Sequence, residues 1–189
     1  MKLYLLSFWS IIDPIYYVFT RLTYLDNGKE TEKNIFRVRL TRYKGRDYVL
    51  SDGTVVHKND LFIKIHLHNA QLISHVKNID SEIRRALIIH QMVEKSLPKL
   101  AEYLHDHAEF NEIKGIIGIT MLNRGTRRLG FDTMEIENRY YKGFKSMALF
   151  PIYWLSVSSI TVNSLKKHDP CYLFMSKEKL LDKYYCYSS

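Results

Sequence analysis

Two histidines two positions apart, His66 and His68, are the first residues whose types and spacing could do chemistry. They lie in a segment of alternating apolar and polar residues, so both imidazoles point to one side of a strand, near Lys64 and Asn69. Two imidazoles on one side could hold a metal ion or an anion. Zinc usually needs three or four ligands and no third is evident, so we predict no metal site. The alternative to an anion site is a polar strand face exposed to solvent.

Three arginines, Arg124, Arg127 and Arg128, form a second candidate site directly after an apolar run. Their i, i+3 and i+4 spacing places them on one face of a short helix. Guanidinium groups bind phosphate through paired hydrogen bonds, and a helix N-terminus also favours an anion. We therefore expect these arginines to hold an anionic ligand, with the histidine pair and Asn69 lining the same cleft. The alternative is a solvated basic helix face.

A third candidate combines aromatic and basic residues in the last third of the chain. Its members are Tyr140, Tyr141, Phe144, Phe150, Tyr153 and Trp154, together with Lys142 and Lys145. Such a mixture could form a belt at a membrane surface, although ordinary core packing explains it equally well. Nucleic-acid binding uses the same residue types, but no RNA- or DNA-binding signature occurs, so we rank nucleic acid below lipid.

Nothing in the sequence indicates a reaction or a cofactor. The sequence has no G-x-S-x-G, P-loop or H-E-x-x-H motif. Cys171 and Cys186 do not form a C-x-x-C pair, and we expect reduced thiols rather than a disulfide or a zinc knuckle.

Length and composition limit the classes of protein that could position these residues. With 189 residues, 46% hydrophobic and 25% charged, the chain is neither a disordered tail, a collagen-like fibre nor a polytopic membrane protein. The length suits one domain with its own core. The formal net charge of +8 favours anionic partners such as nucleic acid, anionic lipid or a phosphate-bearing small molecule.

We predict a single α+β domain over 1–189, with a mixed or antiparallel sheet flanked by helices. Alternating residues and an Asp52-Gly53 turn predict a β-meander over 35–69. A helical period follows over 79–107, with an N-cap near Ser81 and a break or kink at Pro98.

The second half of the chain is expected to complete the sheet. An apolar run predicts a strand buried on both faces, followed by a short helix and another strand within 115–137. The aromatic region over 140–189 is expected to be helical as far as Pro151. It then forms a strand and a helix capped by Ser176.

The first 25 residues form an apolar segment that is predicted to be an amphipathic helix. The run is short of the roughly 20 apolar residues that span a bilayer, and no small-x-small cleavage site follows it. The helix either packs on the core or lies on a membrane. We expect a cytoplasmic protein, with peripheral association with a membrane left open.

Several segments resemble the YkoP-like family of uncharacterised bacterial proteins. They are residues 9–14, 40–45, 52–54, 60–61, 65–69, 124–131 and 174–176, which read WSIIDP, LTRYKG, DGT, DL, IHLHN, RGTRRLGF and FMS. They span nearly the full length of the chain. Related domains occur beside polysaccharide deacetylases, so the resemblance implies an envelope context, although no deacetylase motif is present here.

A weaker resemblance links the second half of the chain to GNAT acyltransferases. It depends on the order of a long helix, the strand over 115–122, a short helix with Gly130-Phe131 and another strand. It implies an acyl-CoA pyrophosphate at the start of the long helix. There, the segment SEIRRA over 81–86 has arginines but no glycine.

The prediction for function is therefore a non-catalytic accessory domain. It would bind an anionic, phosphate-bearing ligand, lipid-linked or soluble, in cell-envelope or polysaccharide metabolism. The alternatives are a GNAT-like acyltransferase and a protein-interaction module.

Overall fold

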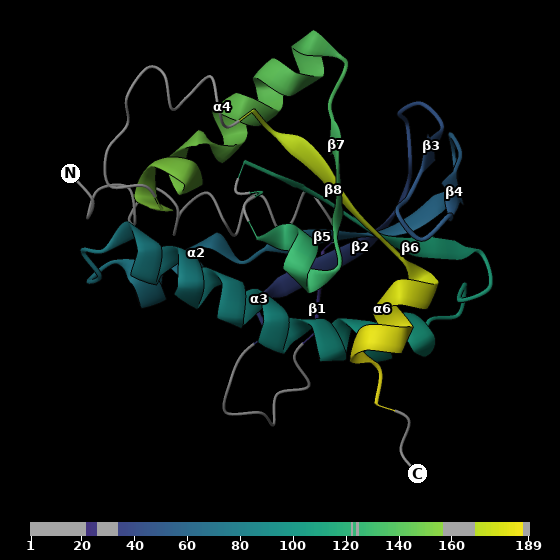
Figure 1. The fold of residues 1–189 in the computed structure, drawn as a ribbon, viewed down its shortest axis with the longest axis horizontal. Helices are drawn as coiled ribbons and strands as arrows, with labels where there is room; N and C mark the ends of the chain where they lie inside the picture. Colours follow the sequence, from purple (N-terminus) through teal and green to yellow (C-terminus); the bar gives the residue numbers. More distant parts are fainter. Residues whose placement is uncertain (1–21, 26–33, 122, 124, 157–168, 187–189) are drawn as a thin grey trace.

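A mixed six-stranded sheet lies at the centre of the molecule, in the order β1-β2-β5-β6-β8-β7 (Figure 1). The computed structural model describes residues 22–25, 34–121, 123, 125–156 and 169–186. Helices α2, α3 and α6 cover one face of the sheet, whereas α4 and the β3–β4 hairpin lie on the other (Figure 1). The strands are β1 (Thr23–Tyr24), β2 (Phe36–Arg42), β3 (Tyr48–Val49), β4 (Val55–Val56), β5 (Leu61–Leu67), β6 (Ile113–Thr120), β7 (Asp132–Glu135) and β8 (Cys171–Ser176). The helices are α2 (Asn69–Val76), α3 (Glu82–His105), the 3-10 turn η1 (Thr126–Leu129), α4 (Arg139–Ser156) and α6 (Lys177–Tyr184).

Strands β2 and β5 form a long antiparallel pair whose register follows their alternating sequences. Val38 pairs with Ile65 and Leu40 with Ile63, so these four apolar side chains share one face. A shift of one residue in either strand would turn its whole apolar set to the other face. The alternation predicted for these two strands is confirmed.

The long helix α3 covers the apolar face of the sheet. Ser81 caps its N-terminus by accepting a hydrogen bond from the backbone N–H of Arg84, as predicted. Leu97, Leu100 and Leu104 lie on one side of the helix and are fully buried. They pack with residues of β2, β5, β6 and β8 to form the larger core.

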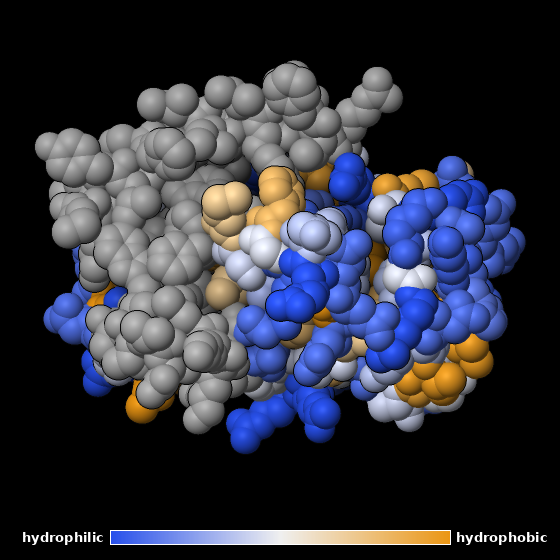
Figure 2. Space-filling view, turned by 90° about the horizontal axis from the view of Figure 1, so that it is seen from above, coloured by the Kyte–Doolittle hydropathy of each residue, from blue (hydrophilic) through white to orange (hydrophobic). Residues whose placement is uncertain are grey.

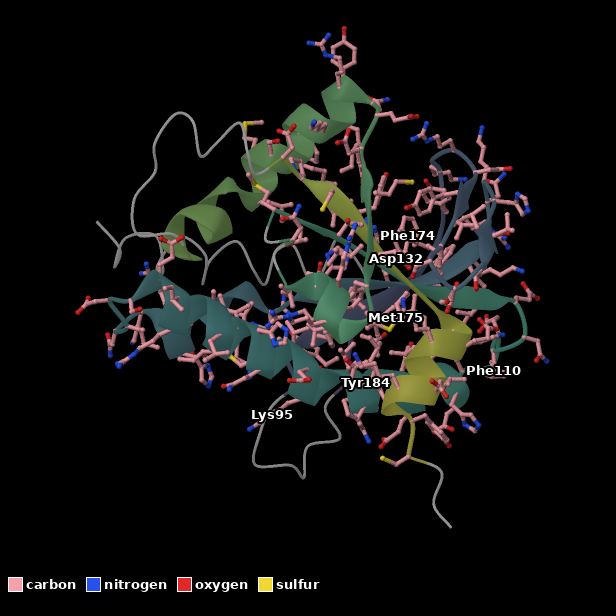
Figure 3. All side chains as sticks on the ribbon, in the orientation of Figure 1. Lys95, Phe110, Asp132, Phe174, Met175 and Tyr184 are labelled. Carbon is pink, nitrogen blue, oxygen red and sulfur yellow. The ribbon has the colours of Figure 1, made fainter. Side chains whose placement is uncertain are left out.

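A second, smaller core lies on the opposite face of the sheet, under the β3–β4 hairpin. Tyr43 is its centre and makes edge-to-face contacts with the rings of Phe62 and Phe174, at centroid distances of 6.4 and 5.3 Å. Figure 3 shows Phe174 and its neighbour Met175 on opposite sides of β8, one toward each core. Strand β8 is therefore buried on both faces.

Hydrogen bonds join the turn of the β3–β4 hairpin to strands β7 and β8 of the sheet. Ser176 is fully buried, donates a hydrogen bond from Oγ to Asp52, and also accepts one from the backbone N–H of Lys179. The second bond makes Ser176 the N-cap of α6, as predicted. Ser51 adds two bonds to the Asp132 carboxylate, from N at 3.2 Å and from Oγ at 3.0 Å.

The structure departs from the sequence predictions at four places. Residues 1–21 of the predicted N-terminal helix lie outside the described residues, and Thr23–Tyr24 form strand β1 instead. The segment 35–69 is not a simple meander, because β3 and β4 pair only with each other and β2 pairs directly with β5. Helix α4 does not end at Pro151 but continues to Ser156. Of the break or kink predicted at Pro98, the structure excludes the break, because α3 is one helix from Glu82 to His105. The short helix after β6 is one 3-10 turn.

Two glycines give a paired test of this packing. Gly115 on β6 has φ +154°, and an added Cβ would collide with the backbone of Met175 and Ser176. Because backbone cannot move aside cheaply, we expect Gly115→Ala to destabilise the fold by more than about 2 kcal/mol in urea unfolding.

The matched control is Gly143→Ala on α4, where an added Cβ meets open space. Alanine is the better helix former, so this variant should gain about 0.5–1 kcal/mol. Equal effects of the two substitutions would contradict the packing described for β6 against β8.

Candidate functional site

Five basic side chains gather on the sheet face opposite α3, and we call them the basic cluster: Arg37, Arg39, Lys64, His66 and Lys145. Two pairs are cross-strand partners, Arg37 with His66 and Arg39 with Lys64. The fifth, Lys145, comes from α4. Because the apolar residues of β2 and β5 face α3, the residues between them must point to this face.

The cluster occupies one half of its sheet face, and the small core occupies the other. A single row of neighbours crosses five strands, from Arg39 through Lys64, Ile117 and Phe174 to Asp132. The row thus begins with two basic residues, continues with two apolar ones under the hairpin and ends with an acid. The only carboxylate of this row lies four strands away from Arg39, at the far side of the small core.

Helix α4 forms the cover over this half of the sheet. Lys145 Nζ lies 5.3 Å from the ring centre of Tyr141 and 5.7 Å from that of Phe144. Tyr141 also faces Tyr172 on β8, and burial together with this neighbour raises the pKa of Tyr172. The cluster is consequently shielded from water by aromatic side chains.

Burial makes positive charge costly in this cluster. Desolvation lowers the pKa of Lys64 to about 8, and the charges of Lys145 and Arg39 add to the effect. Desolvation also lowers the pKa of His66 to about 3, with further contributions from basic neighbours, of which Lys64 is the largest. His66 is therefore neutral at pH 7, and the charge of the site comes from lysine and arginine.

His68 and Asn69 lie next to the cluster but belong to a helix start. His68 Nδ1 accepts a hydrogen bond from the backbone N–H of Gln71 at 3.3 Å, which places His68 at the N-cap of α2. Its own N–H donates to Ile35 O at 2.8 Å, and its ring lies against Tyr24. Asn69 is the first residue of α2. His68 thus has a structural role that the spacing did not reveal.

The predicted arginine site is not brought together with the histidines. Arg124 lies outside the described residues, and Arg127 and Arg128 are exposed on η1. Leu129 of the same turn is buried in the larger core, and its carbonyl accepts a hydrogen bond from Tyr184 of α6 at 2.9 Å. The described arginines of η1 are therefore on the α3 side of the sheet, whereas His66 points to the other side.

The sequence analysis singled out His66 together with Lys64, and Lys145 as part of a separate candidate, but not Arg37 or Arg39. Arg37 and Arg39 alternate with apolar residues just as Lys64 and His66 do. An antiparallel pairing of the two strands would have placed all four on one face. The contribution of Lys145 from α4 had no local signal, because it depends on where that helix packs.

The described residues hold neither a metal-binding cluster nor a membrane-spanning helix. No group of three or more His, Cys, Asp or Glu side chains is arranged there to hold a metal ion. Within the same residues, no helix has the length and apolar character to cross a bilayer.

The low pKa of His66 predicts an acid-sensitive fold. In the unfolded chain the His66 ring has its ordinary pKa of 6.5, whereas in the folded chain its pKa is about 3. The contribution of His66 to the free energy of unfolding is therefore fully present above pH 6.5 and is lost as the pH falls toward 3. At about 1.4 kcal/mol per pH unit, His66 should account for a loss of about 2 kcal/mol between pH 7.5 and pH 5. The measurement is urea unfolding at both pH values for wild type and His66→Gln, and the variant should lose about 2 kcal/mol less.

The exposed His75 on α2 provides the control. His75→Gln should keep the wild-type difference between pH 7.5 and pH 5. If His66→Gln shows that same difference, the burial described for His66 is wrong.

Comparison with known proteins places the whole chain in one family. The YkoP domain family model matches residues 2–184. A protein of Bacillus subtilis (strain 168), named "Uncharacterized protein YkoP", is 47% identical over 184 residues, which cover 97% of this chain and 98% of the relative. No solved structure matches the chain. With the family model and this relative both covering nearly all of it, the chain belongs to the YkoP domain family.

Proposed function

We propose that this chain is an accessory domain that binds an anionic, phosphate-bearing ligand at the basic cluster. The observation that carries the proposal is the excess of positive charge held between the sheet and α4. In the part of the chain that the structure describes, no carboxylate lies within ion-pair distance of Arg39, Lys64 or Lys145.

Charge of one sign in a half-buried place works against folding. Buried cations are normally paired with an anion, because the free energy lost when a charged group leaves water exceeds the free energy gained by packing it. Here the three cations repel one another instead, and Arg39 Nε is buried without a hydrogen-bond partner. An anion bound among them would supply the missing partner and remove this cost.

Phosphate is the anion that these side chains suit best. Arginine donates paired hydrogen bonds to two phosphate oxygens, and lysine adds a compact charge. The aromatic rings of Tyr141 and Tyr172 would border the remainder of the ligand. We propose cell-envelope metabolism as the setting on the family resemblance alone.

The test is binding of pyrophosphate, the simplest soluble probe with two phosphates. Calorimetric titration should detect binding to wild type, and the double variant Lys64→Met and Lys145→Met should bind at least tenfold more weakly. Both substitutions remove a charge and keep the apolar stem, so the free variant should unfold at the same temperature as wild type or higher.

The exposed arginines of η1 provide the matched control. Arg127→Met and Arg128→Met together remove the same amount of charge on the other side of the sheet and should leave pyrophosphate affinity unchanged. Loss of binding in this variant, with normal binding in the lysine variant, would place the ligand at η1. An absence of binding to wild type would also contradict the proposal.

A GNAT-like acyltransferase is a second candidate, favoured by the parallel pair β5–β6. Their pairing ends at Lys64 with Ile117, although β5 continues to Leu67 and β6 to Thr120. Ligands commonly bind at the carboxyl ends of parallel strands. Acetyl-CoA therefore belongs in the same titration, and binding followed by transfer of its acetyl group to an amine would favour the enzyme over the accessory domain.

A further inference from the structure

Helix α4 carries an apolar stripe that the fold leaves uncovered. Tyr140, Phe144 and Met147 are 93%, 60% and 72% exposed. Their i, i+4 and i+7 spacing places them along one side of the helix. Figure 2 looks down on the end of the molecule where α4 lies and shows a small apolar group with hydrophilic side chains along one side of it.

The stripe is separate from the side of α4 that packs on the sheet. The packed side carries Tyr141, which faces Tyr172, and Lys145, which belongs to the basic cluster. These two residues are also one helical turn apart. One helix therefore presents apolar side chains outward and a phosphate-binding lysine inward.

The charge of α4 indicates what could cover the stripe. The sequence of the helix, RYYKGFKSMALFPIYWLS, has no acidic residue and three basic ones: Arg139 is exposed, Lys142 forms an ion pair with Asp169, and Lys145 lies on the packed side. A helix with aromatic and basic residues but no carboxylate is complementary to an anionic lipid surface, where aromatic rings lie at the depth of the headgroups. The net charge of +8 acts in the same direction.

We propose that α4 docks this domain on anionic phospholipid bilayers, with Tyr140, Phe144 and Met147 entering the headgroup region. In this arrangement the helix lies in the plane of the interface and does not cross it. Lys145 lies on the packed side of α4, away from the exposed stripe, so membrane docking and the anion binding proposed above use different sides of one helix.

The experiment is co-sedimentation of the full chain with vesicles. Wild type should sediment with vesicles that contain about 30% phosphatidylglycerol in phosphatidylcholine and bind pure phosphatidylcholine at least tenfold more weakly. The double variant Tyr140→Ser and Met147→Ser should lose at least tenfold in partitioning onto the anionic vesicles. Its stability should stay near that of wild type, since both side chains are exposed.

The matched control uses a second exposed apolar pair. Ile83 and Leu87 are 82% and 55% exposed on α3, on the other side of the sheet. Ile83→Ser with Leu87→Ser should leave partitioning unchanged. Equal losses in both double variants, or equal binding of wild type to both kinds of vesicle, would overturn the docking proposal.

A titration with pyrophosphate separates this inference from the proposed function. The Tyr140 and Met147 variant should bind pyrophosphate like wild type, because neither side chain belongs to the basic cluster. Vesicle binding should in turn survive Lys64→Met and Lys145→Met, because these two side chains lie between the sheet and α4; its loss in that variant would overturn docking through the apolar stripe. Pyrophosphate binding by a wild type that ignores anionic vesicles would overturn docking alone.

Discussion

The burial of one face of the β2–β5 pair against α3 is the constraint on which the remaining structure depends. Val38 and Ile63 are fully buried in the larger core, and this fixes the register of the two strands. The fixed register forces Arg39 and Lys64 onto the opposite face as neighbours. Burial of the apolar side chains in the larger core thus keeps Arg39 and Lys64 next to each other, although their like charges repel.

The opposite face meets two different kinds of cover. Over β6, β8 and β7, the hairpin brings Tyr43 and Val56 onto Phe174 and builds a dry core. Over β2 and β5, α4 brings tyrosines and one more lysine. A purely apolar layer over β2 and β5 would bury their basic side chains without water or a hydrogen-bond partner, which is costly. Helix α4 instead places polar side chains beside them, and under the proposal an anion would supply the opposite charge. One half of this face is therefore a dry core that stabilises the sheet, whereas the other half carries the basic cluster.

Local patterns in the sequence predicted most of the elements, because strands, caps and turns depend on nearby residues. The alternation in β2 and β5, the caps Ser81 and Ser176 and the Asp52-Gly53 turn were all legible in this way. The predictions were wrong where distant contacts decide. Helix α4 continues past Pro151, where it was expected to end, and the hairpin leaves the sheet that it was expected to continue. For the same reason the sequence analysis named His66, Lys64 and Lys145 but did not predict that they lie together, since the position of Lys145 depends on where α4 packs.

The position of β8 in the sheet has a consequence for how the chain folds during synthesis. This strand pairs with β6 on one side and β7 on the other, yet it is the last of the strands to leave the ribosome. Until then, β6 and β7 have no shared neighbour, and their apolar residues and backbone donors stay open to other chains. We therefore expect nascent chains of this family to remain aggregation-prone until late in translation, and chaperones that shield strand edges to act on them during that interval.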